Sequence, residues 1–194
     1  MMNKTAFISI FSALSISVLL QACAPVVVGT AATGVVVAHD RRTTGTVIDD
    51  QGIEFKANQA FYEDKEIEDS SHVNVTSFNL VVLITGETPS EELKQRVGNI
   101  VAALPKVTHV YNELTISAPS SLVSRSSDSL ITSKVKTRLL TIKDFDGTRV
   151  KVVTEKGIVY LMGLVTQQES EIATNAARQV GGVQKVVKLF QYID

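Results

Sequence analysis

Few side chains of this 194-residue chain could perform chemistry, and the sequence places them far apart. There is one cysteine, Cys23, and the three histidines, His39, His72 and His109, lie in separate segments without the spacing of a metal site. Neither a Gly-x-Ser-x-Gly motif nor a glycine-rich nucleotide loop before a helix is present. We therefore predict that the protein is not an enzyme and that it binds no metal and no soluble cofactor.

Cys23 has a different chemistry, which its neighbours define. It ends the tetrapeptide Leu20-Gln21-Ala22-Cys23, which follows a cationic start at Lys4 and an apolar run over residues 6–20. That order is typical of a secretory signal with a small residue before the cut. The tetrapeptide resembles the lipobox of bacterial lipoproteins. This resemblance implies that residues 1–22 are removed and that Cys23 becomes an N-terminus bearing an N-acyl diacylglycerol. More than one acyl chain gives stable membrane anchoring.

The residue after the cysteine bears on where the anchored protein goes. It is Ala24 rather than aspartate, and by resemblance to lipoprotein sorting this indicates the outer membrane, with the chain facing the periplasm. The alternative is a plain secretory signal with an incidental thiol, although a lone free cysteine is an unusual residue to export to an oxidising compartment. Export also argues against a nucleic-acid partner, and the basic residues lack an aromatic platform for bases.

The mature chain is long enough for one average domain or two small ones. Charged residues make up 20% of the whole sequence and its mean hydropathy is +0.17, which describes a folded protein. Residues 26–38 are apolar but too few to span a bilayer as a helix, which needs roughly 20 residues. We expect residues 23–43 to be the acylated N-terminus followed by a flexible tether.

An internal repeat organises the rest of the chain. Residues 73–86 match residues 150–163 at an offset of 77, with valine or isoleucine at corresponding places. Asp50 matches Asp128 at an offset of 78, so the single-residue gaps fall in loops. The repeat predicts a first domain over 44–117, a linker over 118–126 and a second domain over 127–194.

Each repeat has the pattern of a small α+β domain. In the second, Asp128 looks like the N-cap of a helix, and a hairpin follows with its turn at Glu155-Lys156-Gly157. A second helix over 167–180 and a last strand over 183–193 complete an α-β-β-α-β order. We predict a three-stranded mixed sheet covered by two helices. In the first repeat the opening helix, over 53–62, ends in acidic residues, so we expect that end to fray.

At this point the repeat resembles the BON domain of bacterial osmotic-stress and transport-associated proteins. The resemblance rests on Asp128-x-x-Ile-x-x-Lys-Val, Leu161-Met-Gly163 and Val180-Gly-Gly-Val183. A lipobox followed by two such domains is similar to the dual-BON-domain outer-membrane lipoproteins. That likeness implies a non-enzymatic lipoprotein that binds anionic phospholipid, supports outer-membrane integrity and gathers at division sites.

The charges are distributed unevenly between the two domains. Residues 24–117 hold 7 basic and 13 acidic residues, a net of −6, whereas residues 118–194 hold 11 and 7, a net of +4. No acid occurs between Asp128 and Asp144, a segment that is rich in cations. An apolar residue beside cations suits a membrane surface. The predicted phospholipid-binding residues, on the same helix that the family resemblance indicates, are Leu130, Ile131, Lys134, Thr137 and Arg138.

Two alternatives to this lipid-binding surface stay open. The cations could be solvated residues of an ordinary amphipathic helix. The acidic first domain could instead dock an outer-membrane assembly, cell-wall or division-site protein through residues 63–69, a segment that could equally be a solubilising loop. The two domains could also pack on each other through opposite charge.

Gly86 and Gly163, which end corresponding strands, are predicted to be structural glycines that permit a bend or a close approach.

Overall fold

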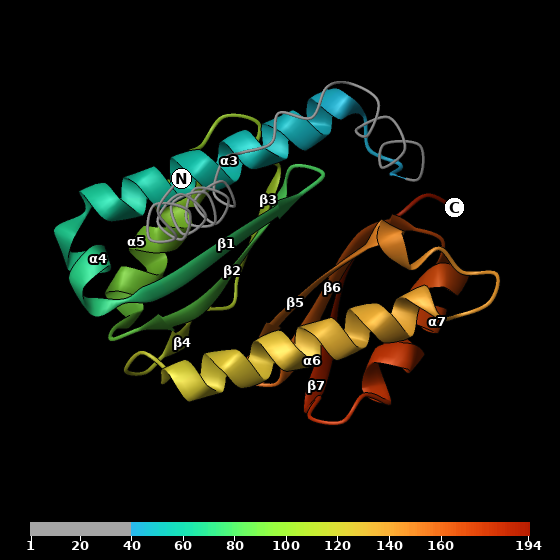
Figure 1. Cartoon of the computed structure of the whole chain (residues 1–194). Coiled ribbons are helices and arrows are strands. Elements are labelled where there is room, and N and C mark those ends of the chain that lie inside the picture. The colour runs from blue at the N-terminus through green and yellow to red at the C-terminus, as the bar shows by residue number, and fades with distance from the viewer. Residues whose placement is uncertain (1–39) are drawn as a thin grey trace, which may run out of the picture. The chain divides into compact units, whose positions relative to one another are not determined.

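A computed structural model describes residues 40–194, which belong to one compact unit. The signal segment, Cys23 and nearly all of the expected tether lie outside the described residues. The predicted α-β-β-α-β order occurs twice (Figure 1). The elements of the first domain are α3 (Thr44–Glu63), α4 (Lys65–Ser70), β1 (His72–Phe78), β2 (Val81–Thr88), α5 (Glu91–Ala102), β3 (His109–Asn112) and β4 (Thr115–Ile116).

The second domain repeats this order with a longer last strand. Its elements are α6 (Leu122–Leu140), the 3-10 turn η2 (Gly147–Arg149), β5 (Val150–Glu155), β6 (Ile158–Val165), α7 (Gln167–Arg178) and β7 (Lys185–Tyr192). β5 and β6 form an antiparallel hairpin and β7 joins β6 in parallel. In the first domain β1 and β2 form the hairpin, and both β3 and β4 pair with β2 in parallel. The predicted mixed sheets and α+β class are confirmed.

Each sheet has one face covered by two helices, and alternation along the strands supplies the buried side chains. In the second domain, Ile131, Val135 and Leu139 of α6 and Ala173 of α7 pack with side chains from β5 and β6. In the first domain, α3 and α5 cover the sheet in the same way. The apolar residues at helical spacing in the sequence are therefore the residues that the helices bury in the two cores.

The opposite faces of the two sheets are also apolar, and they share one cluster. Its buried members are Phe78, Val81 and Leu83 from the first domain and Tyr160, Met162 and Leu189 from the second. One ion pair, Lys156 with Glu87, joins the basic second domain to the acidic first domain, and Arg41, which precedes the first domain, pairs with Glu169 of the second. The shared apolar cluster supplies the main contact between the domains.

Two helix starts differ from the sequence expectation. α6 begins at Leu122, where the Ser121 side chain accepts a hydrogen bond from the Ser124 amide, so part of the expected linker is helical. Asp128 lies buried inside α6 and is not its N-cap. α3 begins at Thr44, nine residues before the expected start at Ile53.

The acidic end of α3 does not fray as expected, because a second helix begins there. Asp64 caps α4, accepting hydrogen bonds from the amides of Glu66 and Ile67. Glu66 and Glu68 then lie in the first turn of α4, where negative charge is stabilised by the helix dipole. Acidic residues that are unfavourable beside the C-terminus of α3 therefore stabilise the N-terminus of α4.

A buried aspartate holds the hairpin turn in each domain. Asp128 accepts hydrogen bonds from the amides of Lys156 and Gly157, at 2.9 and 2.8 Å. Asp50 accepts hydrogen bonds from the amides of Asn79 and Leu80, both at 2.8 Å. These bonds explain why the two aspartates recur at matching places of the repeat: each joins the opening helix to the hairpin.

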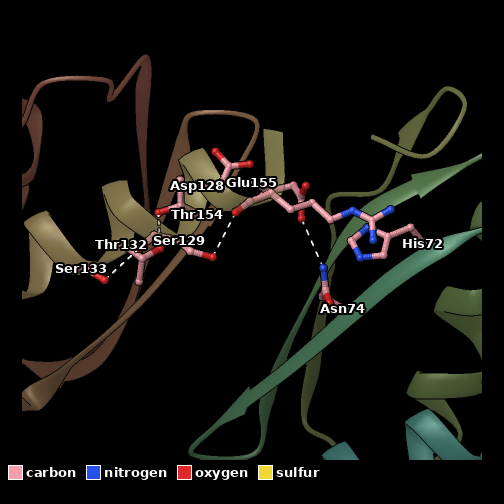
Figure 2. A pocket seen from close by; sticks show the side chains of 9 residues that line it. His72, Asn74, Asp128, Ser129, Thr132, Ser133, Thr154 and Glu155 are labelled. Atoms are coloured by element: carbon pink, nitrogen blue, oxygen red, sulfur yellow. Dashed lines mark hydrogen bonds between the residues drawn. The ribbon is translucent and has the colours of Figure 1, made fainter. Parts of the chain in front are cut away.

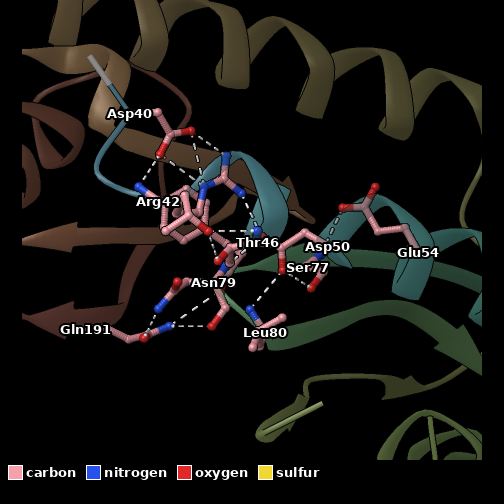
Figure 3. A network of polar contacts seen from close by, with 11 residues as sticks. Asp40, Arg42, Thr46, Asp50, Glu54, Ser77, Asn79, Leu80 and Gln191 are labelled. Carbon is pink, nitrogen blue, oxygen red and sulfur yellow. Dashed lines mark hydrogen bonds and ion pairs between the residues drawn. The ribbon is translucent and has the colours of Figure 1, made fainter. Parts of the chain in front are cut away.

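In the first domain the turn belongs to a larger polar network (Figure 3). Asp50 also accepts a hydrogen bond from the Ser77 hydroxyl at 2.7 Å and forms a 2.8 Å ion pair with Arg42. The Arg42 guanidinium lies 4.0 Å from the centre of the Phe78 ring. Asn79 donates a 2.7 Å hydrogen bond to Gln191 of the second domain, so this turn also contributes to domain packing.

Candidate functional site

The outer face of α6 carries exposed apolar side chains next to cations. Leu130 is 62% exposed and Val123, one heptad earlier, is 80% exposed. Seven residues make almost two full helical turns, so these two side chains lie on one side of α6. Lys134, Thr137 and Arg138 are exposed on the following turns. The structure thus brings four of the five predicted lipid-binding residues to the surface.

Ile131 has to be removed from the predicted contact set. It is only 6% exposed and belongs to the core between α6, α7 and the sheet. Leu130 and Ile131 are adjacent in sequence but point about 100° apart around the helix. Val123, which was assigned to the linker, takes a place on the outer face because α6 begins earlier than expected.

The cations on this surface are largely free of internal partners. No hydrogen bond or ion pair joins the Lys134 ammonium to any other residue of the 40–194 region, and the Arg138 guanidinium donates one hydrogen bond, to the Gln179 side chain at 3.2 Å. The only acid within α6 is Asp128, which is buried and bonded to the hairpin turn. The exposed face of α6 therefore presents positive charge and apolar surface without a carboxylate.

The acidic segment over 63–69, the alternative binding surface, is partly neutralised within its own domain. Arg96 of α5 lies 2.8 Å from Glu66, and Lys65 lies 2.6 Å from Glu68. Asp64 is held by its capping role. These contacts leave less free negative charge for a partner than the sequence suggests.

A polar pocket of about 460 Å³ lies where the first domain meets α6 (Figure 2). His72 and Asn74 of β1 contribute one side, and α6 and the end of β5 contribute the other. The lining residues are His72, Asn74, Arg125, Asp128, Ser129, Thr132, Ser133, Thr154 and Glu155. The pocket is thus built by both repeats and would not exist in either alone.

Three potential metal ligands meet beside this pocket. His72 and Glu87 are cross-strand partners on β1 and β2, and Glu155 ends β5 in the second domain. One ligand atom from each lies within 4.8 Å of the others, and His72 Nδ1 is 3.2 Å from Glu87 Oε2. Lys156 Nζ lies 3.1 Å from the other oxygen of Glu87. The grouping joins one imidazole and two carboxylates across the domain boundary.

The pKa values of Glu87 and Glu155 are shifted in opposite directions. Burial raises the pKa of Glu87, but hydrogen bonds from Lys156 and Ser120 outweigh it, so that pKa lies below its usual value. Burial and the nearby charge of Glu87 raise the pKa of Glu155. The nearby His72 acts in the opposite direction, and the Glu155 carboxylate accepts one hydrogen bond, from Asn74 at 3.4 Å. Glu155 is therefore a buried acid whose negative charge is poorly compensated.

Sequence reasoning missed this cluster, for a reason that the fold makes plain. The pairing of His72 with Glu87 follows from the hairpin once its turn is placed at Asn79-Leu80, because the two residues are equidistant from it. Glu155 lies in the other repeat, and its approach depends on how the domains pack. The expectation that no second ligand type gathers near a histidine is corrected for His72.

His109 behaves as an ordinary strand residue. It begins β3, is exposed, and its ring packs edge-on against Tyr111 with centroids 4.4 Å apart. His39 lies outside the described residues. Within residues 40–194, no helix combines the length and apolar character needed to cross a bilayer.

Comparison with known families and proteins agrees with the repeat. The family model described as BON domain matches residues 49–118 and 127–194. The chain is 39% identical over 181 residues to the outer membrane lipoprotein DolP of Haemophilus influenzae, covering 93% of this chain and 94% of that protein. It is 32% identical over 154 residues to a 21 kDa hemolysin of Actinobacillus pleuropneumoniae, covering 79% of each.

A third relative is more distant. The osmotically-inducible protein Y of Escherichia coli is 28% identical over 145 residues, covering 73% of this chain and 72% of that protein. Two separate family matches in one chain correspond to the two α-β-β-α-β repeats in the structure.

Proposed function

Because this chain belongs to the BON domain family, we propose that it is an outer-membrane lipoprotein that faces the periplasm and binds anionic phospholipid through its second BON domain. The anchor is the acylated Cys23, and the lipid-binding surface is the outer face of α6. The similarity to a relative named as an outer membrane lipoprotein supports the anchor and the location. No enzymatic role is part of the proposal.

The observation that carries the lipid-binding proposal is the composition of the exposed face of α6. Leu130 and Val123 project from it, Lys134 and Arg138 lie beside them, and the one acid of the helix is buried. Near an anionic leaflet each cation contributes about 1 kcal/mol, and burying a leucine side chain contributes roughly 1.5–3 kcal/mol. Together with the acyl anchor, such a surface would hold the domain against the membrane.

Vesicle binding tests this surface directly. The soluble region from residue 40 onward should bind vesicles containing phosphatidylglycerol and should not bind vesicles of phosphatidylcholine. Reversing both Lys134 and Arg138 to glutamate should weaken binding at low salt by at least about 30-fold, since two lost cations are worth about 2 kcal/mol. The loss should shrink as salt is added, because screening weakens the attraction to the wild type.

The matched control reverses two cations elsewhere in the same domain. Lys185 and Lys188 lie exposed on β7, and their reversal changes the net charge by the same amount. If both double variants lose binding equally, the attraction is a general effect of charge and the α6 surface is not a binding site. A Leu130→Ser variant separates insertion from charge, because it should weaken binding even at high salt.

The proposal extends to support of outer-membrane integrity and enrichment at division sites, for which family membership is the support. A fluorescent fusion of the full chain should concentrate at the septum and lose that pattern when Lys134 and Arg138 are reversed. Septal enrichment that survives the reversal would favour a protein partner, and the acidic segment over 63–69 is the surface to alter next.

A further inference from the structure

The cluster of His72, Glu87 and Glu155 has the chemistry of a metal site that neither the sequence pattern nor the proposed lipid binding explains. We propose that these three side chains bind a first-row divalent cation, zinc being the best match, and that the ion fastens the two BON domains together. His72 and Glu87 come from the first domain and Glu155 from the second.

The ligand types and their separation fit zinc. Zinc takes imidazole nitrogen and carboxylate oxygen at about 2.0–2.2 Å, and two such ligands at a tetrahedral angle stand about 3.4 Å apart. His72 Nδ1 and Glu87 Oε2 are 3.2 Å apart. All three ligand atoms lie within 4.8 Å of one another, so a rotation of the Glu155 side chain toward His72 and Glu87 would complete a three-ligand site.

Burial gives an independent reason to expect a cation here. Glu87 is 0% exposed and Glu155 is 7% exposed. A buried carboxylate is costly unless it is paired or coordinates a metal. The Glu155 carboxylate accepts only the long hydrogen bond from Asn74. Burial and the charges of Glu87 and Asp128 raise its pKa, and His72 offsets only part of this effect. A dication between Glu87 and Glu155 would compensate both.

Lys156 is the built-in competitor of such an ion. Its ammonium lies 3.1 Å from Glu87 Oε1, whereas Oε2 is the oxygen next to His72, and 3.0 Å from the Ser117 hydroxyl. Its side chain is 33% exposed, so it can turn toward solvent when an ion binds. The remaining coordination position would face the polar pocket, where water can complete the shell as zinc sites with three protein ligands require.

Calorimetric titration of the full acylated chain in detergent, after treatment with EDTA, tests the proposal with zinc chloride as the probe. One zinc ion per chain should bind. Glu155→Gln should weaken its affinity at least about tenfold, because it removes one of three ligands, and His72→Asn should do the same. Glu155→Gln is expected to fold, since it removes a buried charge and retains the contact with Asn74.

His109→Asn is the matched control, because His109 is an exposed histidine on another strand of the same sheet. Its zinc affinity should equal that of the wild type. Lys156→Gln should change the affinity in the opposite direction, raising it several-fold by removing the competing ammonium. No zinc binding by the wild type, or equal binding by Glu155→Gln and the wild type, would overturn the proposal.

The fastening role has its own readout. Zinc should slow amide hydrogen exchange at the start of β1 and at the end of β5 together, and this effect should vanish in Glu155→Gln. Slower exchange at β1 alone would mean that the ion is held within the first domain and does not join the two. Vesicle binding through α6 can fail without affecting either result, because its cations take no part in this site.

Discussion

Asp50 in the first BON domain and Asp128 in the second lie at matching positions of their opening helices, yet they are bonded to different extents. Asp128 accepts two backbone hydrogen bonds from its turn, whereas Asp50 accepts two from its own turn and also binds Ser77 and Arg42. The turn sequences explain the difference. Lys156-Gly157 places glycine at a φ of 74°, while the first domain places Leu80 at a φ of 67°.

A left-handed conformation costs a non-glycine residue roughly 1–2 kcal/mol. In the first domain, Asp50 and Arg42 form the network that holds Leu80 in this conformation, and they do so with a charge pair that the second domain lacks (Figure 3). One repeat can therefore lose a turn glycine when side chains from neighbouring segments hold the turn. The first domain's turn thus depends more on electrostatic contacts than the second domain's turn.

The outer faces of the two opening helices differ as well. α3 exposes Ile48, Phe55 and Tyr62 at heptad spacing, but Asp49, Glu54 and Glu63 outnumber the lone lysine of that helix. α6 exposes Leu130 among cations instead. Both helices thus present apolar side chains, and the sign of the flanking charge is what separates a surface suited to anionic lipid from one that such a membrane repels.

Gly86 and Gly163 do not end their strands as expected, since β2 continues to Thr88 and β6 to Val165. These two glycines give the strongest test of the structural difference. At Gly86 the φ is +118° and a Cβ would lie 1.9 Å from the His72 carbonyl oxygen, whereas at Gly163 it would lie 2.7 Å from the Arg149 carbonyl oxygen. We expect Gly86→Ala to destabilise its domain by more than about 4 kcal/mol and Gly163→Ala by less, because only the first combines backbone strain with a severe clash. Urea unfolding followed by circular dichroism measures both. Equal losses of stability would mean that the backbone around Gly86 can shift to accommodate the added Cβ.

The turn aspartates should show an intermediate effect. Asp50→Ala leaves the Ser77 hydroxyl and two turn amides without their acceptor and removes one of the two carboxylates paired with Arg42. We therefore expect a loss of about 3–5 kcal/mol in the free energy of unfolding. Asp128→Ala leaves two turn amides unbonded and should lose about 2–3 kcal/mol. The same urea titration compares them, with Glu63→Ala as an exposed control of α3. A larger loss for Asp128 would contradict the greater electrostatic dependence of the first domain's turn.

Glu169 should give the smallest and most pH-dependent effect. Its burial would raise its pKa, but hydrogen bonds from Arg41, the Thr166 amide and Arg149 lower it to about 2. A depressed pKa contributes stability above the ordinary value near 4.5, and this contribution is lost as the pH falls toward 2. Glu169→Gln should therefore be less stable than wild type at pH 7, by on the order of 2 kcal/mol, and nearly equal to it at pH 2.

Glutamine preserves the capping box at the start of α7, in which Glu169 bonds the Thr166 amide, so this substitution isolates the charge. The check is a series of urea midpoints from pH 2 to pH 7. A constant difference between the two proteins over that range would show that the ion pairs with Arg41 and Arg149 contribute nothing.

The sequence alone determined the repeated α-β-β-α-β order, the core face of each helix and the family, because hydrophobic periodicity and turn residues act over short distances. It also placed Leu130, Lys134 and Arg138 on one side of a helix. The early starts of α3 and α6 escaped it, since their caps are Thr43 and Ser121, which resemble many other hydroxyl residues in these segments.

Only the tertiary structure shows how the two repeats pack against each other. Strands β2 and β6 carry apolar residues on both faces, and both faces are buried. The sequence indicates this burial, but it does not say which part of the chain covers each face. Only the packing of Phe78 and Leu83 against Tyr160 and Met162 shows that each sheet covers the other. The same packing brings Glu155 to a histidine 83 positions away in the sequence. No local sequence pattern predicts that Glu155 lies near His72, because their proximity depends on how the two domain cores pack against each other.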